Sequence, residues 1–353
     1  MTAYVWPLAI YAVVLVLHLI VPARHVEGYV TDDAGRPLRY RLNGLGVFVV
    51  VIGAYVLAGV RHWLAWDFFY DVRWQMLAGA CVLGLAFTLA IVLSAPPHRS
   101  LPADLYFGRR ENPQWGGGRL DAKMFLYLAG AIMLELNVLS FAAHHVLRYG
   151  TSPGVLVHAA LFTFFLAEYL SFERVHLYTY DFLAERVGFK LGWGCLVFYP
   201  FFYCVGLWWA ADQPDAHTPV PLLAVYAALF FAGWALSRGA NLQKFLFKTD
   251  PHAKLFGFLQ PVTLSAGGKQ VLCSGFWGLS RHINYLGEIL MAVGLTLCLG
   301  HPGALLPWLY PLYYVALLVP RQHDDDKRCA AKYGELWTEY CKRVPYRIIP
   351  WIY

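Results

Sequence analysis

Six side chains able to bind an anion or to exchange a proton lie within twelve residues, directly before an apolar stretch. They are Trp277, Arg281, His282, Asn284, Tyr285 and Glu288. An arginine and a histidine are suited to phosphate or ribose oxygens, and the amide and phenol groups add further hydrogen bonds. Because lipid penalises polar groups that lack partners, so dense a cluster requires a ligand or a packed network.

A second group of reactive side chains ends an apolar stretch near the middle of the chain. Glu168 and Tyr169 are followed by three more carboxylates, Glu173, Asp181 and Glu185. A buried acid whose pKa is raised by desolvation can donate a proton at neutral pH. These residues are therefore candidates for proton transfer.

The composition places both groups in a membrane protein. Hydrophobic residues make up 59% of the 353 and charged residues 14%, a balance typical of polytopic membrane proteins. A helix needs about 20 apolar residues to cross the hydrocarbon core. The predicted fold is all-α with nine to ten transmembrane helices. The nine candidate spans are 4–22, 42–60, 75–95, 123–143, 155–172, 191–210, 219–237, 284–300 and 303–319.

The basic residues predict the orientation of these spans. All but three of the 28 Lys and Arg residues, namely Arg61, Arg73 and Arg148, fall on one side. The positive-inside rule makes that side cytoplasmic, with the N-terminus outside and the C-terminal tail inside. Long polar stretches lie on the cytoplasmic side too, so we expect a soluble ligand to enter from there. A bacterial inner membrane and an endoplasmic reticulum both fit.

The chain is predicted to form one integral domain, 1–353, in which 238–353 is the cofactor-binding half and 321–353 its cytoplasmic tail. The turn Gly300-His301-Pro302-Gly303 cannot continue a helix and makes 284–319 an antiparallel hairpin. The Ser274–Glu288 cluster must then face Arg321–Asp326 at one membrane surface.

Two polar residues inside an apolar span have a structural interpretation. Glu135 and Asn137 fall within 123–143, where a hydrogen bond to a neighbouring helix would remove most of their cost. We therefore expect them to pack between helices rather than to react.

Cations and aromatic residues alternate around the predicted cytoplasmic mouth. Phosphate contacts and a stacking face are what a nucleotide cofactor requires, although orientation and interfacial anchoring explain the same composition. No G-x-G-x-x-G or G-x-x-x-x-G-K-[ST] loop is present. The 13 His and seven Cys residues lack metal-ligand spacing, and no basic stripe for nucleic acid is visible. Neither a metal nor a nucleic acid is expected.

Two longer motifs resemble one known family, the sterol reductases, which reduce C=C bonds in the ring system or in the aliphatic tail of a sterol and which include the sterol C14-reductases and the lamin B receptor. The first motif is Gly-Leu-Ser-Arg-His-Ile-Asn-Tyr-Leu-Gly-Glu from Gly278, and the second is the tail from Cys329 to Tyr353. The segment Arg238-Gly-Ala-Asn241 resembles the C14 branch most closely, while Ser274–Gly278 is also similar to the C7 branch.

This resemblance implies an NADPH pocket at the cytoplasmic mouth and a cavity for a sterol or a related polycyclic isoprenoid. It assigns the cofactor side to Lys244, Lys248, Trp277, His282, Asn284, Tyr285, Arg321, Asp325 and Tyr333. It assigns the substrate side to Glu168, Tyr169 and Tyr203, with Tyr169, Glu173 and Asp325 as candidate catalytic residues. The family usually has Arg-Asp-Glu where this protein has Asp324-Asp325-Asp326. That change puts an anion in place of a cation and leaves NADPH and NADH both open.

The implied reaction is protonation of an alkene followed by hydride transfer from the nicotinamide. Tyr169 or a neighbouring carboxyl is the favoured proton donor, ahead of Asp325. C14=C15 is the favoured bond, and a C7 or C24 double bond is the alternative within the family.

Two other functions compete. The short pattern R-H-x-N-Y-x-G is shared with the isoprenylcysteine carboxyl methyltransferases, which predicts an S-adenosylmethionine-dependent lipid methyltransferase. The third possibility is a sterol-binding protein without catalysis.

Overall fold

The computed structural model describes residues 2–32 and 34–353, which form two compact units, 1–217 and 218–353. The unit boundary lies in the polar segment before the helix that carries Arg238–Lys244. The predicted cofactor half, 238–353, thus belongs entirely to the second unit.

Unit 1 is built around one long buried helix, α6, which contacts α1, α2, α3, α7, α10 and α11. In the most apolar window of α6, 83% of the residues are buried. Its first turn is capped by Asp121, whose carboxylate accepts a hydrogen bond from the Met124 amide at 3.0 Å, which satisfies one of the free amides of a helix start. The elements of unit 1 are η1 (Thr2–Val5), α1 (Trp6–Ile20), β1 (Arg24–Thr31), β2 (Pro37–Leu42), α2 (Gly44–Val60), α3 (Phe68–Asp71), α4 (Arg73–Leu93), α5 (Leu101–Phe107), β3 (Gln114–Trp115), β4 (Leu120–Asp121), α6 (Ala122–Tyr149), α7 (Pro153–Ser171), α8 (Glu173–His176), α9 (Tyr180–Leu183), the π-helix η2 (Gly194–Phe198), α10 (Tyr199–Phe202) and α11 (Val205–Ala210).

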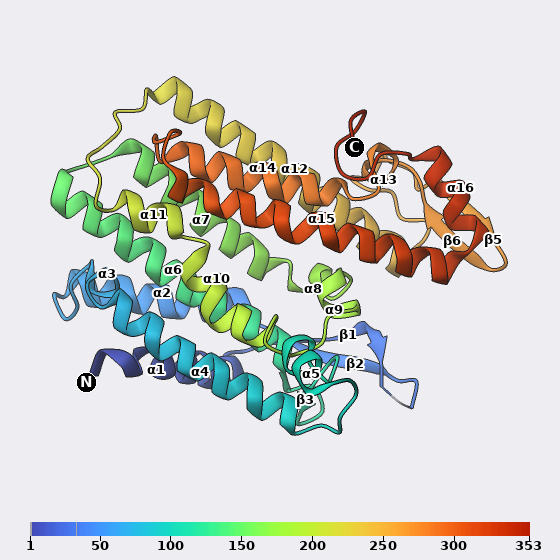
Figure 1. The fold of residues 1–353 in the computed structure, drawn as a ribbon, viewed down its shortest axis with the longest axis horizontal. Helices are drawn as coiled ribbons and strands as arrows, with labels where there is room; N and C mark the ends of the chain where they lie inside the picture. Colours follow the sequence, from blue (N-terminus) through green and yellow to red (C-terminus); the bar gives the residue numbers. More distant parts are fainter. Residues whose placement is uncertain (1, 33) are drawn as a thin grey trace. The chain divides into compact units, whose positions relative to one another are not determined.

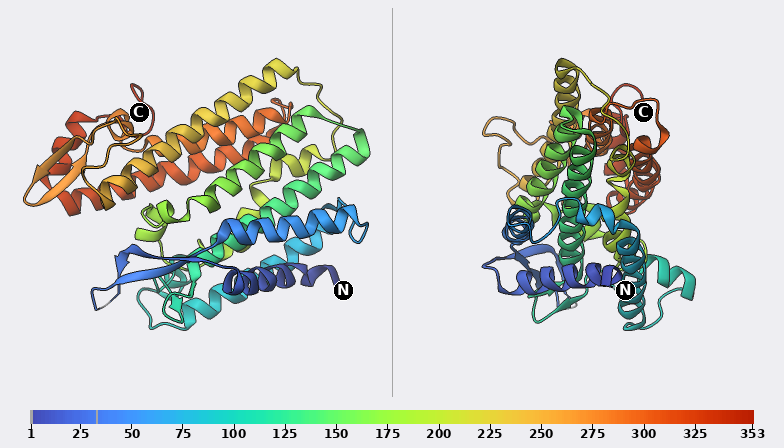
Figure 2. Two further views of the ribbon diagram at one scale, coloured as in Figure 1. Left: turned by 180° about the vertical axis from the view of Figure 1, so that it is seen from behind. Right: turned by 90° about the vertical axis from the view of Figure 1, so that its left-hand side faces the viewer.

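Unit 2 consists of three long helices, α12, α14 and α15, which run side by side in both Figure 1 and Figure 2. A smaller group of elements follows the polar ends of these helices. The elements are α12 (Val220–Thr249), β5 (Thr263–Ala266), β6 (Lys269–Leu272), α13 (Phe276–Leu279), α14 (Ile283–Cys298), α15 (Leu305–Tyr333) and α16 (Glu335–Arg343).

Two glycines bring α12 and α14 into backbone contact. A Cβ atom added to Gly287 would lie 2.5 Å from the Gly233 carbonyl oxygen and from the Ser237 amide nitrogen. Such a crossing of small residues is how membrane helices approach most closely. It holds the start of α14, and with it the polar cluster, against the middle of α12.

In the part of the chain that the structure describes, five helices are long and apolar enough to cross a membrane. They are Thr2–Ile20, Arg73–Leu93, Ala122–Tyr149, Pro153–Ser171 and Val220–Thr249. Helices α2 and α14 are apolar but shorter. The protein is therefore a mostly helical integral membrane protein, and the finer count of nine to ten spans stays a prediction. The predicted span 191–210 is helical but divided among η2, α10 and α11.

Within the described residues, three two-stranded antiparallel hairpins, β1–β2, β3–β4 and β5–β6, are additions to the predicted all-α fold. The β1–β2 hairpin projects beyond α1 and α2, which it connects (Figure 2). Much of the polar tail is helical, because α15 continues as one helix to Tyr333 and is followed by α16.

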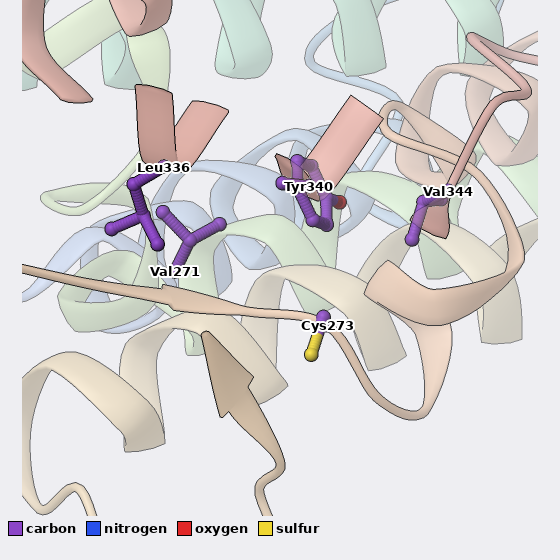
Figure 3. Close-up of a cluster of buried hydrophobic side chains, with 5 residues drawn as sticks. All are labelled: Val271, Cys273, Leu336, Tyr340 and Val344. Atoms are coloured by element: carbon purple, nitrogen blue, oxygen red, sulfur yellow. The ribbon is translucent and has the colours of Figure 1, made fainter. Parts of the chain in front are cut away.

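A small apolar core holds α16 against β6. It consists of Val271, Cys273, Leu336, Tyr340 and Val344 (Figure 3). The Tyr340 hydroxyl donates a hydrogen bond to the Trp277 carbonyl, outside this core, at 2.9 Å. The tail is thereby fixed to the segment that carries the polar cluster.

Candidate functional site

The polar cluster of unit 2 is held by the C-terminal segment. The amides of Arg281 and His282 donate to the carbonyls of Tyr346 and Arg347 at 3.0 and 2.8 Å. His282 then starts α14 as its N-cap residue. Two motifs far apart in sequence are thus joined by backbone hydrogen bonds.

Asp326 on α15 is the anionic centre of this cluster. Its carboxylate lies 3.8 Å from Arg281 Nη2, 3.9 Å from Arg347 Nε and 3.9 Å from His282 Nε2. Burial would raise the pKa of Asp326, but these neighbouring positive groups outweigh it and hold the pKa below its usual value. Asp326 therefore stays ionised and orients the cationic side chains around it.

His282 links three of the predicted cofactor residues. Its side chain is 3% exposed and stacks on Tyr285 with 5.0 Å between ring centroids. Its Nδ1 atom lies 4.0 Å from the nearer Asp325 carboxylate oxygen. The structure thus brings His282, Tyr285 and Asp325 together.

Lys244 and Trp277 form the other side of the cluster. The Lys244 ammonium lies 5.7 Å from the centre of the Trp277 ring, and Asp325 is close enough to interact with it electrostatically. The Trp277 indole donates to the Ala240 carbonyl at 2.9 Å. A cation and an aromatic face are therefore presented side by side by α12 and α13.

Several buried polar atoms in this cluster have no hydrogen-bond partner. Among the described residues these include Arg281 Nε, His282 Nε2, Asn284 Oδ1, Gln322 Oε1 and Asp326 Oδ1. Leaving such atoms unsatisfied is costly. Donors, acceptors and a stacking surface in one place fit the ribose, phosphate and amide groups of a nicotinamide dinucleotide.

The remaining predicted cofactor residues lie in the same unit at different distances from this centre. Arg321 is one helical turn before Asp325 on α15, so both share a face of the helix. Lys248 is one turn after Lys244 on α12. Tyr333 packs against the apolar core of α16 and stacks on Trp337 at 6.4 Å between centroids, so it lies at the edge of the cluster.

Asp324, the residue that departs from the family pattern, is exposed, whereas Asp325 and Asp326 are partly buried. The extra negative charge therefore projects outward from α15. The two acids that follow it are the ones that interact with His282.

A separate pocket lies in unit 1. It is small and is lined by Met124, Tyr127, Leu128, Tyr169, Leu170, Glu173, His176 and Phe182. Two of the three candidate catalytic residues, Tyr169 and Glu173, thus line the same largely apolar pocket.

Glu173 is the buried acid of this pocket. Its side chain is 6% exposed, and Oε2 accepts a hydrogen bond from the Gly44 amide at 3.0 Å, at the start of α2. Burial raises the pKa of Glu173 to about 7, although the Gly44 hydrogen bond acts in the opposite direction. At neutral pH this carboxyl is therefore protonated in a large fraction of molecules and can serve as an acid.

Two predicted substrate residues lie elsewhere in the unit. Glu168 and Tyr203 are not among the described residues that line this pocket. Glu168 is buried near the end of α7, and Tyr203 follows α10, where its ring contacts that of Tyr199 at 4.7 Å.

Sequence reasoning missed His176, which follows Glu173 by three residues on α8. Its ring stacks on Tyr169 with 3.9 Å between centroids and 25° between planes. The available signal was the spacing, since residues three apart lie on the same side of a helical turn.

One group of metal-type side chains also exists in unit 1. The ligand atoms of Asp67, Asp71 and His144 lie within 4.8 Å of one another. His144 Nδ1 already faces the Asp67 carboxylate at 3.2 Å, and Asp71 is exposed. A hydrogen bond between the His144 ring and the Asp67 carboxylate accounts for their proximity.

Comparison with known proteins relates these features to a family. The sequence matches the ergosterol biosynthesis ERG4/ERG24 family over residues 1–353. It is 33% identical to a Delta(14)-sterol reductase of Arabidopsis thaliana, in an alignment covering 95% of this chain and 91% of the relative. It is also 33% identical to a Delta(14)-sterol reductase of Methylotuvimicrobium alcaliphilum (94% and 79% covered) and to the Delta(14)-sterol reductase TM7SF2 of Mus musculus (95% and 82%). The chain therefore belongs to the ergosterol biosynthesis ERG4/ERG24 family.

Proposed function

We propose that this protein is an oxidoreductase that reduces the C14=C15 double bond of a sterol with NADPH. Membership of the family over the full length and the names of the relatives support the sterol reaction. The observation that carries the proposal is the pocket of unit 1, in which a buried carboxyl with a raised pKa lies beside a phenol.

An isolated alkene accepts hydride poorly, so the reaction begins with a proton. Glu173 has one carboxylate oxygen on the Gly44 amide, which leaves the other oxygen to carry the proton. Tyr169 lines the same pocket and is the second candidate donor. Protonation of one alkene carbon produces a carbocation at the other carbon, which then accepts the hydride.

The cofactor would be held by the cluster of unit 2. Lys244 offers a charge for a phosphate, Trp277 a stacking face, and His282 and Asn284 hydrogen bonds to ribose or amide groups. When bound, NADPH supplies the hydride that completes the reduction. Asp326 does not contact the cofactor in this proposal but keeps Arg281 and His282 in place.

The proposed setting is a membrane with the unit 2 cluster facing the cytoplasm. The N-terminus is then outside and the tail of α15 and α16 inside. The positive-inside distribution supports this orientation.

The direct test uses the purified protein in lipid nanodiscs with NADPH and a Δ14-sterol. The expected result is a saturated C14–C15 bond in the product, identified by mass spectrometry, with one NADPH oxidised per sterol. Consumption of a Δ7- or Δ24-sterol instead would contradict the bond assignment. Methylation of a prenylated cysteine by S-adenosylmethionine, without NADPH oxidation, would contradict the reductase itself.

The proton donor is tested by comparing Glu173→Gln with Tyr169→Phe. Removing a general acid lowers kcat by about 100-fold or more. The donor is the residue whose variant shows that loss while still binding NADPH. Near-normal turnover in both variants would exclude this pocket as the source of the proton.

A further inference from the structure

A tight turn after α12 displays two aromatic rings to the surroundings. Phe256 is 60% exposed and Phe258 73% exposed, and their ring centroids are 6.3 Å apart. The amides of Leu255 and Leu259 each donate to the other's carbonyl at 3.0 Å, which closes the turn. Contiguous exposed apolar surface is one of the features of membrane interaction sites.

The conformation of the turn favours this display. Phe256 has a φ of 55° and Gly257 a φ of 79°, and positive values are unfavourable for a bulky residue such as phenylalanine. Leu255, by contrast, is only 2% exposed and anchors the turn. The fold thus accepts backbone strain at Phe256 while both rings point outward.

The position of the turn along the length of α12 follows from its contacts. Gly275 is so close to both Leu259 and Gln243 that an added Cβ would be 2.6 Å from Leu259 Cδ2 and 2.5 Å from Gln243 Nε2. Leu259 is therefore at the level of Gln243, which is six residues before the end of α12 at Thr249. The chain after α12 has turned back toward the apolar half of the helix.

That level corresponds to the headgroup layer of a bilayer. The predicted span 219–237 ends directly before Arg238, which therefore lies at the edge of the hydrocarbon core. At about 1.5 Å per residue, Gln243 lies about 7–8 Å beyond Arg238, and the interfacial layer on each side is about 5–8 Å thick. Phe256 and Phe258 are thus within reach of the acyl chains.

The exposed residues of α12 support the same position of the turn relative to the membrane. Val220, Val225 and Phe231 are 69%, 60% and 42% exposed on this predicted span, as expected of lipid-facing residues. Lys254, directly before the turn, is exposed and complements anionic headgroups. An apolar pair next to a cation is the usual composition of an interfacial anchor.

We propose that the turn Leu255–Leu259, together with Lys254 directly before it, inserts into the headgroup layer of the membrane that the protein spans, with Phe256 and Phe258 among the acyl chains of phospholipids. The partner is the lipid interface and not another protein. This anchor would fix the end of α12, which carries Lys244 and Lys248, relative to the bilayer.

The test places the photoreactive residue benzoylphenylalanine at position 256 or 258 of the full-length protein. The protein is reconstituted in nanodiscs of phosphatidylcholine and phosphatidylglycerol that contain a radiolabelled phospholipid. Gln270 is the control position, because it is exposed on β6, at the end of unit 2 farthest from the start of α12 (Figure 1). Irradiation is expected to attach at least fivefold more labelled lipid at 256 and 258 than at 270.

Equal labelling at all three positions would overturn the proposal, and crosslinks to a second copy of the protein would identify the turn as a subunit contact instead. A second measurement uses the double variant Phe256→Ser and Phe258→Ser in the same nanodiscs. Trypsin should cleave after Lys254 at least threefold faster in this variant than in the parent protein. Equal cleavage rates would show that the rings do not insert.

Discussion

The imidazole of His176 lies almost parallel to the phenol ring of Tyr169, with 3.9 Å between their centroids. Both rings line the pocket that contains Glu173. A small displacement of a reacting group is enough to lower a rate substantially. We therefore expect His176 to act as a positioning residue for Tyr169.

Replacing His176 by Phe preserves a flat ring, whereas replacing it by Leu does not. If stacking holds Tyr169 in place, His176→Phe keeps kcat within about threefold and His176→Leu lowers it by about tenfold or more. Both rates are measured with NADPH and the Δ14-sterol, together with their pH profiles. A large loss in both variants, with an altered pH profile for Phe, would show that the imidazole charge matters rather than its shape.

The raised pKa of Glu173 predicts how stability depends on pH. The pKa is about 7 in the folded protein against a reference value of 4.5. Protonation therefore favours the folded state, and the stabilising contribution is complete below about pH 4.5 and lost as the pH rises through 7. Between pH 5 and 8 the free energy of unfolding should fall by about 2–3 kcal/mol on account of this group.

The melting temperatures of the parent protein and of Glu173→Gln, measured between pH 5 and 8, test this contribution to stability. Glu173→Gln should show the weaker pH dependence. The control is Gly53→Ala on α2, which leaves Glu173 in place, adds a Cβ that meets nothing within 4 Å, and should keep the full dependence on pH. Parallel curves for the parent and Glu173→Gln would contradict the assignment.

Because α12 and α14 are in close backbone contact, we expect one added methyl group at this crossing to lower the stability of the protein. Gly287→Ala places a Cβ about 2.5 Å from backbone atoms of α12, and such overpacking costs about 1–3 kcal/mol. Gly53→Ala on α2 is the matched control, because an added Cβ there meets nothing within 4 Å. We expect a lower melting temperature for Gly287→Ala and an unchanged or higher one for Gly53→Ala. Equal shifts would argue against close packing at this crossing.

The two ends of the acidic run should differ in their effect on cofactor binding. Asp324 is exposed and Asp326 faces His282 and Arg281. Asp324→Asn is expected to change the dissociation constant of NADPH by less than about twofold. Asp326→Asn and His282→Ala are each expected to raise it by about tenfold, because the first no longer holds Arg281 and His282 in place and the second removes a hydrogen bond to the cofactor. Calorimetry with NADPH and NADH measures both. A strong effect at Asp324 would place that residue on the nucleotide.

Much of the architecture was predictable because membrane helices need long apolar segments. Each of the nine predicted spans coincides with helical structure, although only five of the described helices are both long and apolar enough to count as crossing by themselves. Glu135 and Asn137 behave as predicted, since Glu135 accepts a hydrogen bond from Thr163 on α7 at 2.6 Å and Asn137 donates to the Pro200 carbonyl at 2.9 Å. Polar groups in lipid must find such partners.

The candidate site was predictable in part. The Gly300–Gly303 turn forced the hairpin, and the dense motif around His282 identified the cluster. Asp326, Gln322 and His176 were not identified as site residues, because their importance depends on which side of a helix meets which neighbour.

The sequence alone therefore determined that this is a membrane protein of the sterol reductase type, because hydrophobic length and motif spacing are properties of the chain itself. Tertiary structure decided which acid is buried and which is exposed. Glu173 has its raised pKa only because folding buries its carboxyl, and the Gly44 hydrogen bond opposes that shift without cancelling it. Asp324 is exposed only because of its place on α15. Desolvation depends on the neighbours that folding supplies, which no local pattern contains.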